Sequence, residues 1–119
     1  MSLIGFFRFC FYFALLSISL LAVLPQQQLV ITTGWDKANH ALAFFVLLWL
    51  LDYAYPAASL WVKKILPLLI YGLLIECVQS QIPGRYLSLL DFFSDIVGLA
   101  AYLFIRPILI NNKLFIDAD

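Results

Sequence analysis

The hydrophobic positions of this chain form four long stretches separated by short polar connections. The stretches cover roughly residues 4–24, 38–55, 62–81 and 89–110. A helix needs about 20 residues to cross a hydrocarbon core of about 30 Å, so each stretch is long enough, or nearly so, to span a membrane. The pattern predicts an all-α polytopic membrane protein, in which residues 1–119 form a single domain with four transmembrane helices.

The overall composition agrees with this pattern. Hydrophobic residues make up 65% of the chain and charged residues 12%, and the mean hydropathy is +1.00. These values indicate an integral membrane protein, with membrane lipids as partners, rather than a soluble domain. The formal net charge of +0 argues against nucleic acid or another polyanion as a partner.

The first apolar stretch has an alternative interpretation as a secretory signal peptide, because Arg8 precedes most of its apolar residues. However, no Ala-x-Ala-type cleavage site follows, and Pro25 comes directly after the stretch. Its length is also closer to that of a membrane span than to the short core of a signal peptide. We therefore predict that residues 4–24 form a transmembrane helix.

Basic residues in the short connections predict the orientation of the bundle. Lys and Arg are enriched on the cytoplasmic side of membrane proteins, and four spans place both termini on the same side. The basic residues on that side outnumber those on the other: Arg8, Lys63, Lys64, Arg106 and Lys113 against Lys37 and Arg85. Both termini are therefore predicted to be cytoplasmic, and the connections at residues 25–34 and 82–88 to face outward.

Polar residues gather at the outward end of the predicted bundle. They come from the second, third and fourth helices and their flanks: Asp36, Lys37, His40, Glu76, Gln79, Arg85, Ser88, Asp91 and Asp95. Residues three, four and seven apart share one face of a helix. This spacing aligns the following residues on three faces: Asp36, His40, Ala43, Phe44 and Leu47; Gly72, Glu76, Gln79 and Pro83; Ser88, Asp91, Asp95, Gly98 and Tyr102. We expect a polar cup that opens outward above an apolar inner half of the bundle.

Charge favours contact among these residues. A charged side chain at the centre of a transmembrane helix costs roughly 2.5–3.5 kcal/mol on translocon-type scales, so such residues usually face the bundle interior. The carboxylates of the cup outnumber Lys37 and Arg85, and we expect Arg85 to bind Glu76 or Asp91. The remaining negative charge can be relieved by protonation of a carboxylate, by an imidazolium at His40 or by a bound cation.

These residue types suggest distinct chemical roles. A histidine among carboxylates can provide general acid–base chemistry, which makes four residues candidate catalytic groups: His40, Glu76, Asp91 and Asp95. The other five are candidate ligand-binding residues, of which the two basic ones could hold an anion: Asp36, Lys37, Gln79, Arg85 and Ser88.

A metal site and a purely structural role are alternatives for the same residues. His40 with carboxylates offers mixed nitrogen and oxygen ligands, but a lone histidine lacks the two-histidine spacing of common zinc motifs. We therefore predict no metal and no other cofactor. A structural role, in which buried polar residues only fix the register of the helices, would be an expensive solution.

The polar residues also carry a resemblance to a known family. The pattern Asp36-Lys37-x-x-His40, followed by Glu76-x-x-Gln79-x-x-x-Pro83-Gly84-Arg85-x-x-Ser88-x-x-Asp91-x-x-x-Asp95-x-x-Gly98, resembles the VanZ-like family of small bacterial membrane proteins. It covers the second to fourth predicted helices and implies a multi-pass protein of the bacterial cytoplasmic (inner) membrane. The family more often has Asn at the position of Asp95, so this chain adds a negative charge.

Two classes of function follow. The VanZ-like family is named after a protein implicated in low-level resistance to the glycopeptide teicoplanin, which implies a role in the cell envelope. In the first class, the cup binds or modifies an envelope lipid, a peptidoglycan precursor or a glycopeptide. In the second, the chain is a small membrane enzyme that acts on a lipid-linked envelope substrate. A transporter is less favoured, since an apolar inner half offers no polar path to the cytoplasm.

Overall fold

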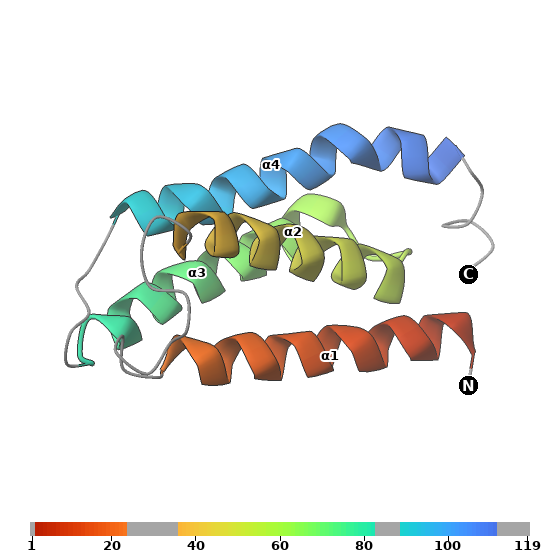
Figure 1. Ribbon diagram of the computed structural model, residues 1–119. Coiled ribbons are helices and arrows are strands. Elements are labelled where there is room, and N and C mark those ends of the chain that lie inside the picture. Colours follow the sequence, from red (N-terminus) through yellow and green to blue (C-terminus); the bar gives the residue numbers. More distant parts are fainter. Residues whose placement is uncertain (1, 24–35, 83–88, 112–119) are drawn as a thin grey trace.

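A computed structural model of the 119-residue chain describes residues 2–23, 36–82 and 89–111. Every regular element within these three segments is helical, which confirms the predicted all-α class. In chain order the elements are α1 (Leu3–Ala22), α2 (Asp36–Ala54), the π-helical turn η2 (Trp61–Ile65), α3 (Leu66–Gln79) and α4 (Leu89–Asn111) (Figure 1). Each predicted apolar stretch is therefore helical, and the third is divided between η2 and α3.

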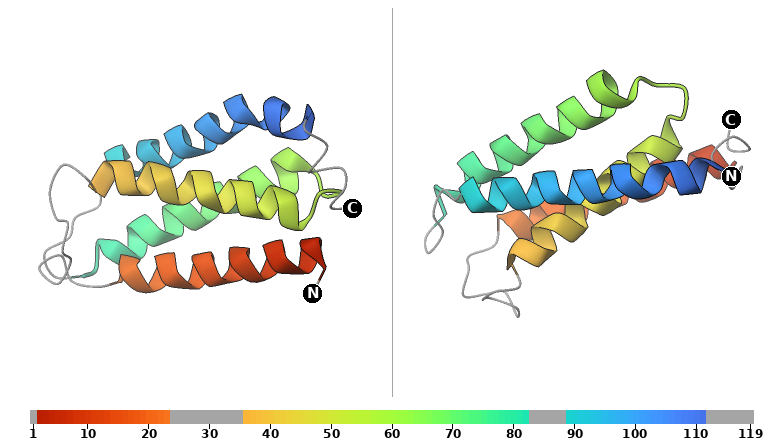
Figure 2. Two further views of the ribbon diagram at one scale, coloured as in Figure 1. Left: turned by 45° about the vertical axis from the view of Figure 1, so that its right-hand side comes forward. Right: turned by 90° about the horizontal axis from the view of Figure 1, so that it is seen from above.

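Successive helices run in opposite directions along a bundle with extents of 45 × 28 × 24 Å. As a result, the start of α1 and the end of α4 lie at the same end of the bundle. α2 is the central helix, because it packs most extensively on α4 and next on α1. It lies between these two helices in Figure 1 and in the left view of Figure 2.

Local sequence signals account for two of the helix starts. The Ser2 side chain accepts a hydrogen bond from the Gly5 amide at 2.9 Å, which satisfies one of the free N–H groups at the start of α1. Pro67 lies in the first turn of α3. Because η2 runs directly into α3, the missing N–H of Pro67 removes a hydrogen bond to the preceding turn at the point where π-helical geometry gives way to α-helical geometry.

α2 contributes much of the buried core. Four of its hydrophobic residues are at most 1% exposed: Leu47, Leu48, Tyr53 and Ala54. Phe7 of α1 packs its ring edge-to-face against Tyr53, with ring centroids 5.0 Å apart. This packing helps to fix the rotation of α2 and thereby the directions of His40 and Asp52.

A glycine brings α2 and α4 into backbone contact. A Cβ atom added at Gly98 would overlap the carbonyl oxygen of Ala41 and lie 3.0 Å from the backbone nitrogen of Phe45. Small residues allow this kind of close approach between helices. Gly98 therefore sets the distance between the two helices that carry His40 and Asp95.

Large apolar side chains cover much of the outer surface of the bundle. Phe13, Leu74 and Phe104 are 63%, 59% and 84% exposed, respectively. By length and composition, two described helices could cross a membrane: Leu3–Ala22, with 20 residues, and Leu89–Leu109, with 21. α2 contains a shorter apolar helix, Ala38–Ala54.

Candidate functional site

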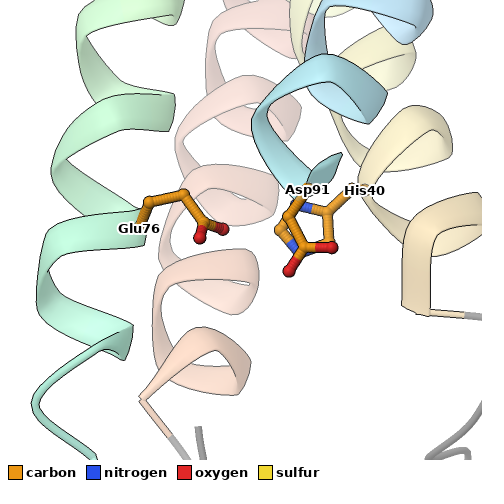
Figure 3. Close-up of side chains that lie close together, drawn as sticks. All are labelled: His40, Glu76 and Asp91. Carbon is orange, nitrogen blue, oxygen red and sulfur yellow. The ribbon is translucent and has the colours of Figure 1, made fainter. Parts of the chain in front are cut away.

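Three helices bring four of the predicted site residues together, and we call this group the His40 cluster: His40, Glu76, Asp91 and Asp95. His40 lies one turn into α2, Glu76 lies in the last turn of α3, and the two aspartates lie one turn apart near the start of α4. Figure 3 shows Glu76 pointing from α3 towards His40 and Asp91. The predicted convergence of these three helix faces is confirmed for the described residues.

Asp95 fixes the position of the His40 ring. Its Oδ1 atom lies 2.8 Å from Nδ1 of His40, a distance typical of a charge-assisted hydrogen bond. The other ring nitrogen, Nε2, lies 3.8 Å from Oδ2 of Asp91, which is too long for a hydrogen bond. An ionised Asp95 requires the proton on Nδ1, so in neutral His40 the lone pair of Nε2 faces the side of Asp91.

The His40 cluster has a partly exposed level and a buried level. The side chains of His40 and Asp91 are each 16% exposed, whereas Glu76 is 2% exposed and Asp95 is fully buried. A small molecule at this end of the bundle would therefore meet His40 and Asp91 before the two deeper carboxylates.

Gly72 makes room for the buried carboxylate of Asp95. A Cβ atom at Gly72 would lie 3.0 Å from Oδ2 of Asp95 and 3.3 Å from the ring of Phe44. The close neighbours of Gly72 thus come from α4 and from α2. Within the described part of the chain, Asp95 Oδ2 has no hydrogen-bond partner.

Three residues of the cluster could together hold a metal ion. One ligand atom each from His40, Glu76 and Asp91 lies within 4.8 Å of the other two. Each ligand comes from a different helix, so no sequence motif with short spacing marks the group.

The structure places the five predicted ligand-binding residues differently. Gln79 is buried and donates a hydrogen bond from Nε2 to the carbonyl oxygen of Ala22 at 3.1 Å, which fixes its amide against the end of α1. Asp36 and Lys37 form the first turn of α2, but their side chains lie outside the described part. Arg85 and Ser88 lie in the undescribed segment 83–88, and so does the predicted contact of Arg85 with Glu76 or Asp91.

A second polar group lies at the opposite end of the bundle. We call it the Asp52 cluster: Asp52, Lys64, Tyr102 and Arg106. The carboxylate of Asp52 is fully buried and accepts hydrogen bonds from Lys64 Nζ, from the Tyr102 hydroxyl at 2.7 Å and from Arg106 Nε at 2.7 Å. These bonds join α2 to η2 and to α4.

The prediction of an apolar inner half is therefore wrong. The helix faces that carry the His40 cluster continue at helical spacing to this end: Asp52 follows Phe44 and Leu48 at intervals of four, and Arg106 follows Tyr102 by four. Such spacing keeps residues on one side of a helix. Counting of basic residues places Lys64 and Arg106 at the flanks of the spans, although the helical period already puts Arg106 on the face of Tyr102.

The π-helical turn determines which lysine joins the Asp52 cluster. Within η2, Lys64 is 1% exposed, whereas its neighbour Lys63 is exposed on the surface of the bundle. Nearby, Arg8 of α1 donates from Nε to the carbonyl oxygen of Ala54 at 2.9 Å and lies over the ring of Tyr55 at 4.4 Å from its centroid. α1 is thus tied to the same end of the bundle.

Comparison with models of known families, with curated proteins and with solved structures finds no match to this chain.

Proposed function

We propose that this chain is a VanZ-like protein of the bacterial cytoplasmic membrane, with four spans and both termini in the cytoplasm. The proposal is supported by the apolar side chains on the outer faces of the helices and by the two helices that are long and apolar enough to span. Contiguous apolar surface of this extent is unfavourable in water. In a lipid bilayer the same surface would contact apolar acyl chains.

We further propose that the His40 cluster binds the polar head of a cell-envelope lipid, a lipid-linked peptidoglycan precursor or a glycopeptide. The observation that carries this proposal is the two-level burial of the cluster near one end of the bundle. His40 and Asp91 are partly exposed there, above the buried Glu76 and Asp95. With the proposed orientation, this end lies at the outer membrane surface, where lipid head groups meet water.

The chemistry of the His40 cluster favours a ligand rich in hydroxyl and amino groups. Its three carboxylates accept hydrogen bonds, and carboxylates bind charged donors more strongly than neutral ones. Sugar and peptide portions of envelope precursors and glycopeptides carry such donors. Lys37, in the first turn of α2, and Arg85 are assigned the anionic part of the ligand in this proposal.

The alternative is an enzyme that acts on a lipid-linked envelope substrate. The 2.8 Å contact between His40 and Asp95 favours this function, because a carboxylate that orients a histidine is a recurrent device for general base catalysis. In that role, His40 Nε2 would remove a proton from a substrate hydroxyl or water, and Asp91 or Glu76 would return a proton to the leaving group.

Native mass spectrometry of the purified full-length protein tests the binding proposal. We expect an added lipid-linked peptidoglycan precursor to bind with one molecule per chain, and the variant Glu76→Gln to bind it at least about tenfold more weakly, since the lost charge weakens hydrogen bonds to the ligand. Ser94→Ala is the matched control, because Ser94 lies on the flank of α4 and donates to the Leu90 carbonyl of its own helix. Equal binding by the wild type and Glu76→Gln would reject the assignment of the ligand to this site.

A further inference from the structure

The ligand atoms of the His40 cluster have the arrangement of a metal site. His40, Glu76 and Asp91 each offer one atom within 4.8 Å of the other two, and the three side chains point into a common space from three helices (Figure 3). Two ligands of one ion at about 2.1 Å can be at most about 4.2 Å apart. The atoms must therefore close by at most about 0.6 Å, which small changes of side-chain torsion can provide.

The separation of His40 and Asp91 fits two ligands of one ion better than a direct contact. At 3.8 Å, Nε2 and Oδ2 are beyond hydrogen-bond distance. Two atoms at about 2.1 Å from a shared ion reach this separation when the angle at the ion is about 130°. An ion between these atoms would therefore require little movement of either side chain.

Asp95 supplies an independent indication of a metal ion. Metal-binding histidines almost always donate their second ring N–H to a carboxylate or carbonyl, which fixes the ring and strengthens it as a ligand. Asp95 Oδ1 accepts at this position, 2.8 Å from His40 Nδ1. Nε2 is thereby directed to the side where Asp91 and Glu76 lie.

The burial of Asp95 also calls for a positive charge nearby. The residue is fully buried, and its Oδ2 atom has no hydrogen-bond partner among the described residues. A buried carboxylate is costly unless a positive charge compensates it. An ion on Nε2 would polarise the imidazole and make the Nδ1–H group a stronger donor to Asp95.

We propose that His40 Nε2, Glu76 and Asp91 bind a divalent transition-metal ion, of the Zn²⁺ or Mn²⁺ type, with Asp95 as the positioning residue. One imidazole and two carboxylates suit these ions, whereas Ca²⁺ and Mg²⁺ prefer oxygen ligands alone. Three protein ligands leave at least one coordination position open for water or a further ligand. The metal site does not depend on the proposed function, since it rests only on the described residues of the His40 cluster.

Metal binding can be measured directly on purified full-length protein. After removal of any affinity tag and of bound metal with EDTA, the protein is dialysed against Zn²⁺ or Mn²⁺ and analysed by elemental mass spectrometry without any lipid ligand. We expect about one ion per chain, and Mn²⁺ bound in the site should give a broadened electron paramagnetic resonance spectrum. Substoichiometric metal below about 0.2 ions per chain for both ions would overturn the proposal.

Variants separate this site from adventitious binding at the surface. Glu76→Gln and Asp91→Asn should each lower the affinity at least tenfold, and Asp95→Asn should lower it by about 10- to 100-fold while keeping the stoichiometry. Ser94→Ala, on the same helix, should bind like the wild type. Unchanged metal affinity in all three cluster variants would reject the proposal, and circular dichroism verifies that each variant remains folded. A metal-binding protein without affinity for envelope lipids would refute only the proposed function.

Discussion

Asp95 of α4 is hydrogen-bonded to His40 of α2 at 2.8 Å, close to the point where Gly98 brings the backbones of the same two helices into contact. Gly98 lies three residues after Asp95 and therefore close to the same face of α4. The short distance between the helices is what allows an aspartate, with its short side chain, to reach the imidazole ring. The chemistry of the His40 cluster thus depends on a residue that has no side chain.

Gly98→Ala should destabilise the protein and weaken the His40 cluster. The added methyl group overlaps the Ala41 carbonyl oxygen, so α2 and α4 must separate, and overpacking of this kind costs about 1–3 kcal/mol. Thermal unfolding in detergent measures the effect. Ala100→Val, on the exposed side of α4, is the control and should change stability by less than about 0.5 kcal/mol. Equal stability of Gly98→Ala and the wild type would contradict the observed contact.

Asp52→Asn should be one of the most destabilising single substitutions in the chain. It removes the negative charge that Lys64 and Arg106 both contact, and breaking a buried ion pair typically costs about 3–5 kcal/mol. Unfolding by denaturant reports this loss.

The two adjacent lysines of η2 provide a matched comparison for the Asp52 cluster. Lys64→Gln should cause a loss of stability similar to that of Asp52→Asn, whereas Lys63→Gln, at an exposed position, should stay within about 0.5 kcal/mol of the wild type. Equal effects of the two lysine substitutions would show that the buried pair contributes no specific stability.

The proposed topology predicts a labelling pattern in intact cells. Single cysteines at Gln27 or Ser88 should react with a membrane-impermeant thiol reagent, because the basic residues favour an external location for these connections. Cysteines at Ser59 or Asn112 should react only after the cells are permeabilised. The native Cys10 and Cys77 are first replaced by Ser or Ala. The reverse pattern would invert the protein and place the His40 cluster at the cytoplasmic surface.

Substitutions at the His40 cluster distinguish an enzyme from a binding protein. In an enzyme, His40→Ala and Glu76→Gln should each abolish the phenotype that expression of the protein produces in cells, because proton transfer tolerates no isostere. The abundance of each variant in the membrane should stay close to that of the wild type. In a binding protein, Glu76→Gln should reduce the effect gradually, and high expression should restore part of it. If both variants keep full function and only unfold at a lower temperature, the cluster is structural and both proposed functions are wrong.

The helices and their interior faces were predictable because both follow from short-range patterns. The length of an apolar run predicts a helix, and the 3.6-residue period selects the face that carries Gly72 and Glu76 or Asp91 and Asp95. The described members of all three predicted faces lie at least partly buried in the structure. Contact between these faces followed from the cost of placing charged residues towards lipid.

Neither the Asp52 cluster nor the arrangement of possible metal ligands in the His40 cluster was predicted, because both depend on how the helices pack against one another. The α-helical period alone does not identify which of Lys63 and Lys64 faces inward, since the π-helical turn changes the rotation of the chain at that point. Similarly, the distances among His40, Glu76 and Asp91 depend on the packing of three separate helices. The lone histidine therefore suggested no metal, although its second nitrogen is held by Asp95.

The π-helical turn sets how α3 is rotated about its axis relative to the residues that precede it. Each residue in an α-helix turns the chain by about 100°, whereas the i→i+5 hydrogen bonds of a π-helical turn accommodate one extra residue. If Trp61–Ile65 became α-helical with all of its residues kept, one side of the turn would therefore rotate against the other by roughly 100°. Either Lys64 would leave Asp52, or Glu76 would leave the space that it shares with His40 and Asp91. The π-helical geometry of a single turn thus allows Lys64 and Glu76 to reach the two polar clusters at opposite ends of the bundle.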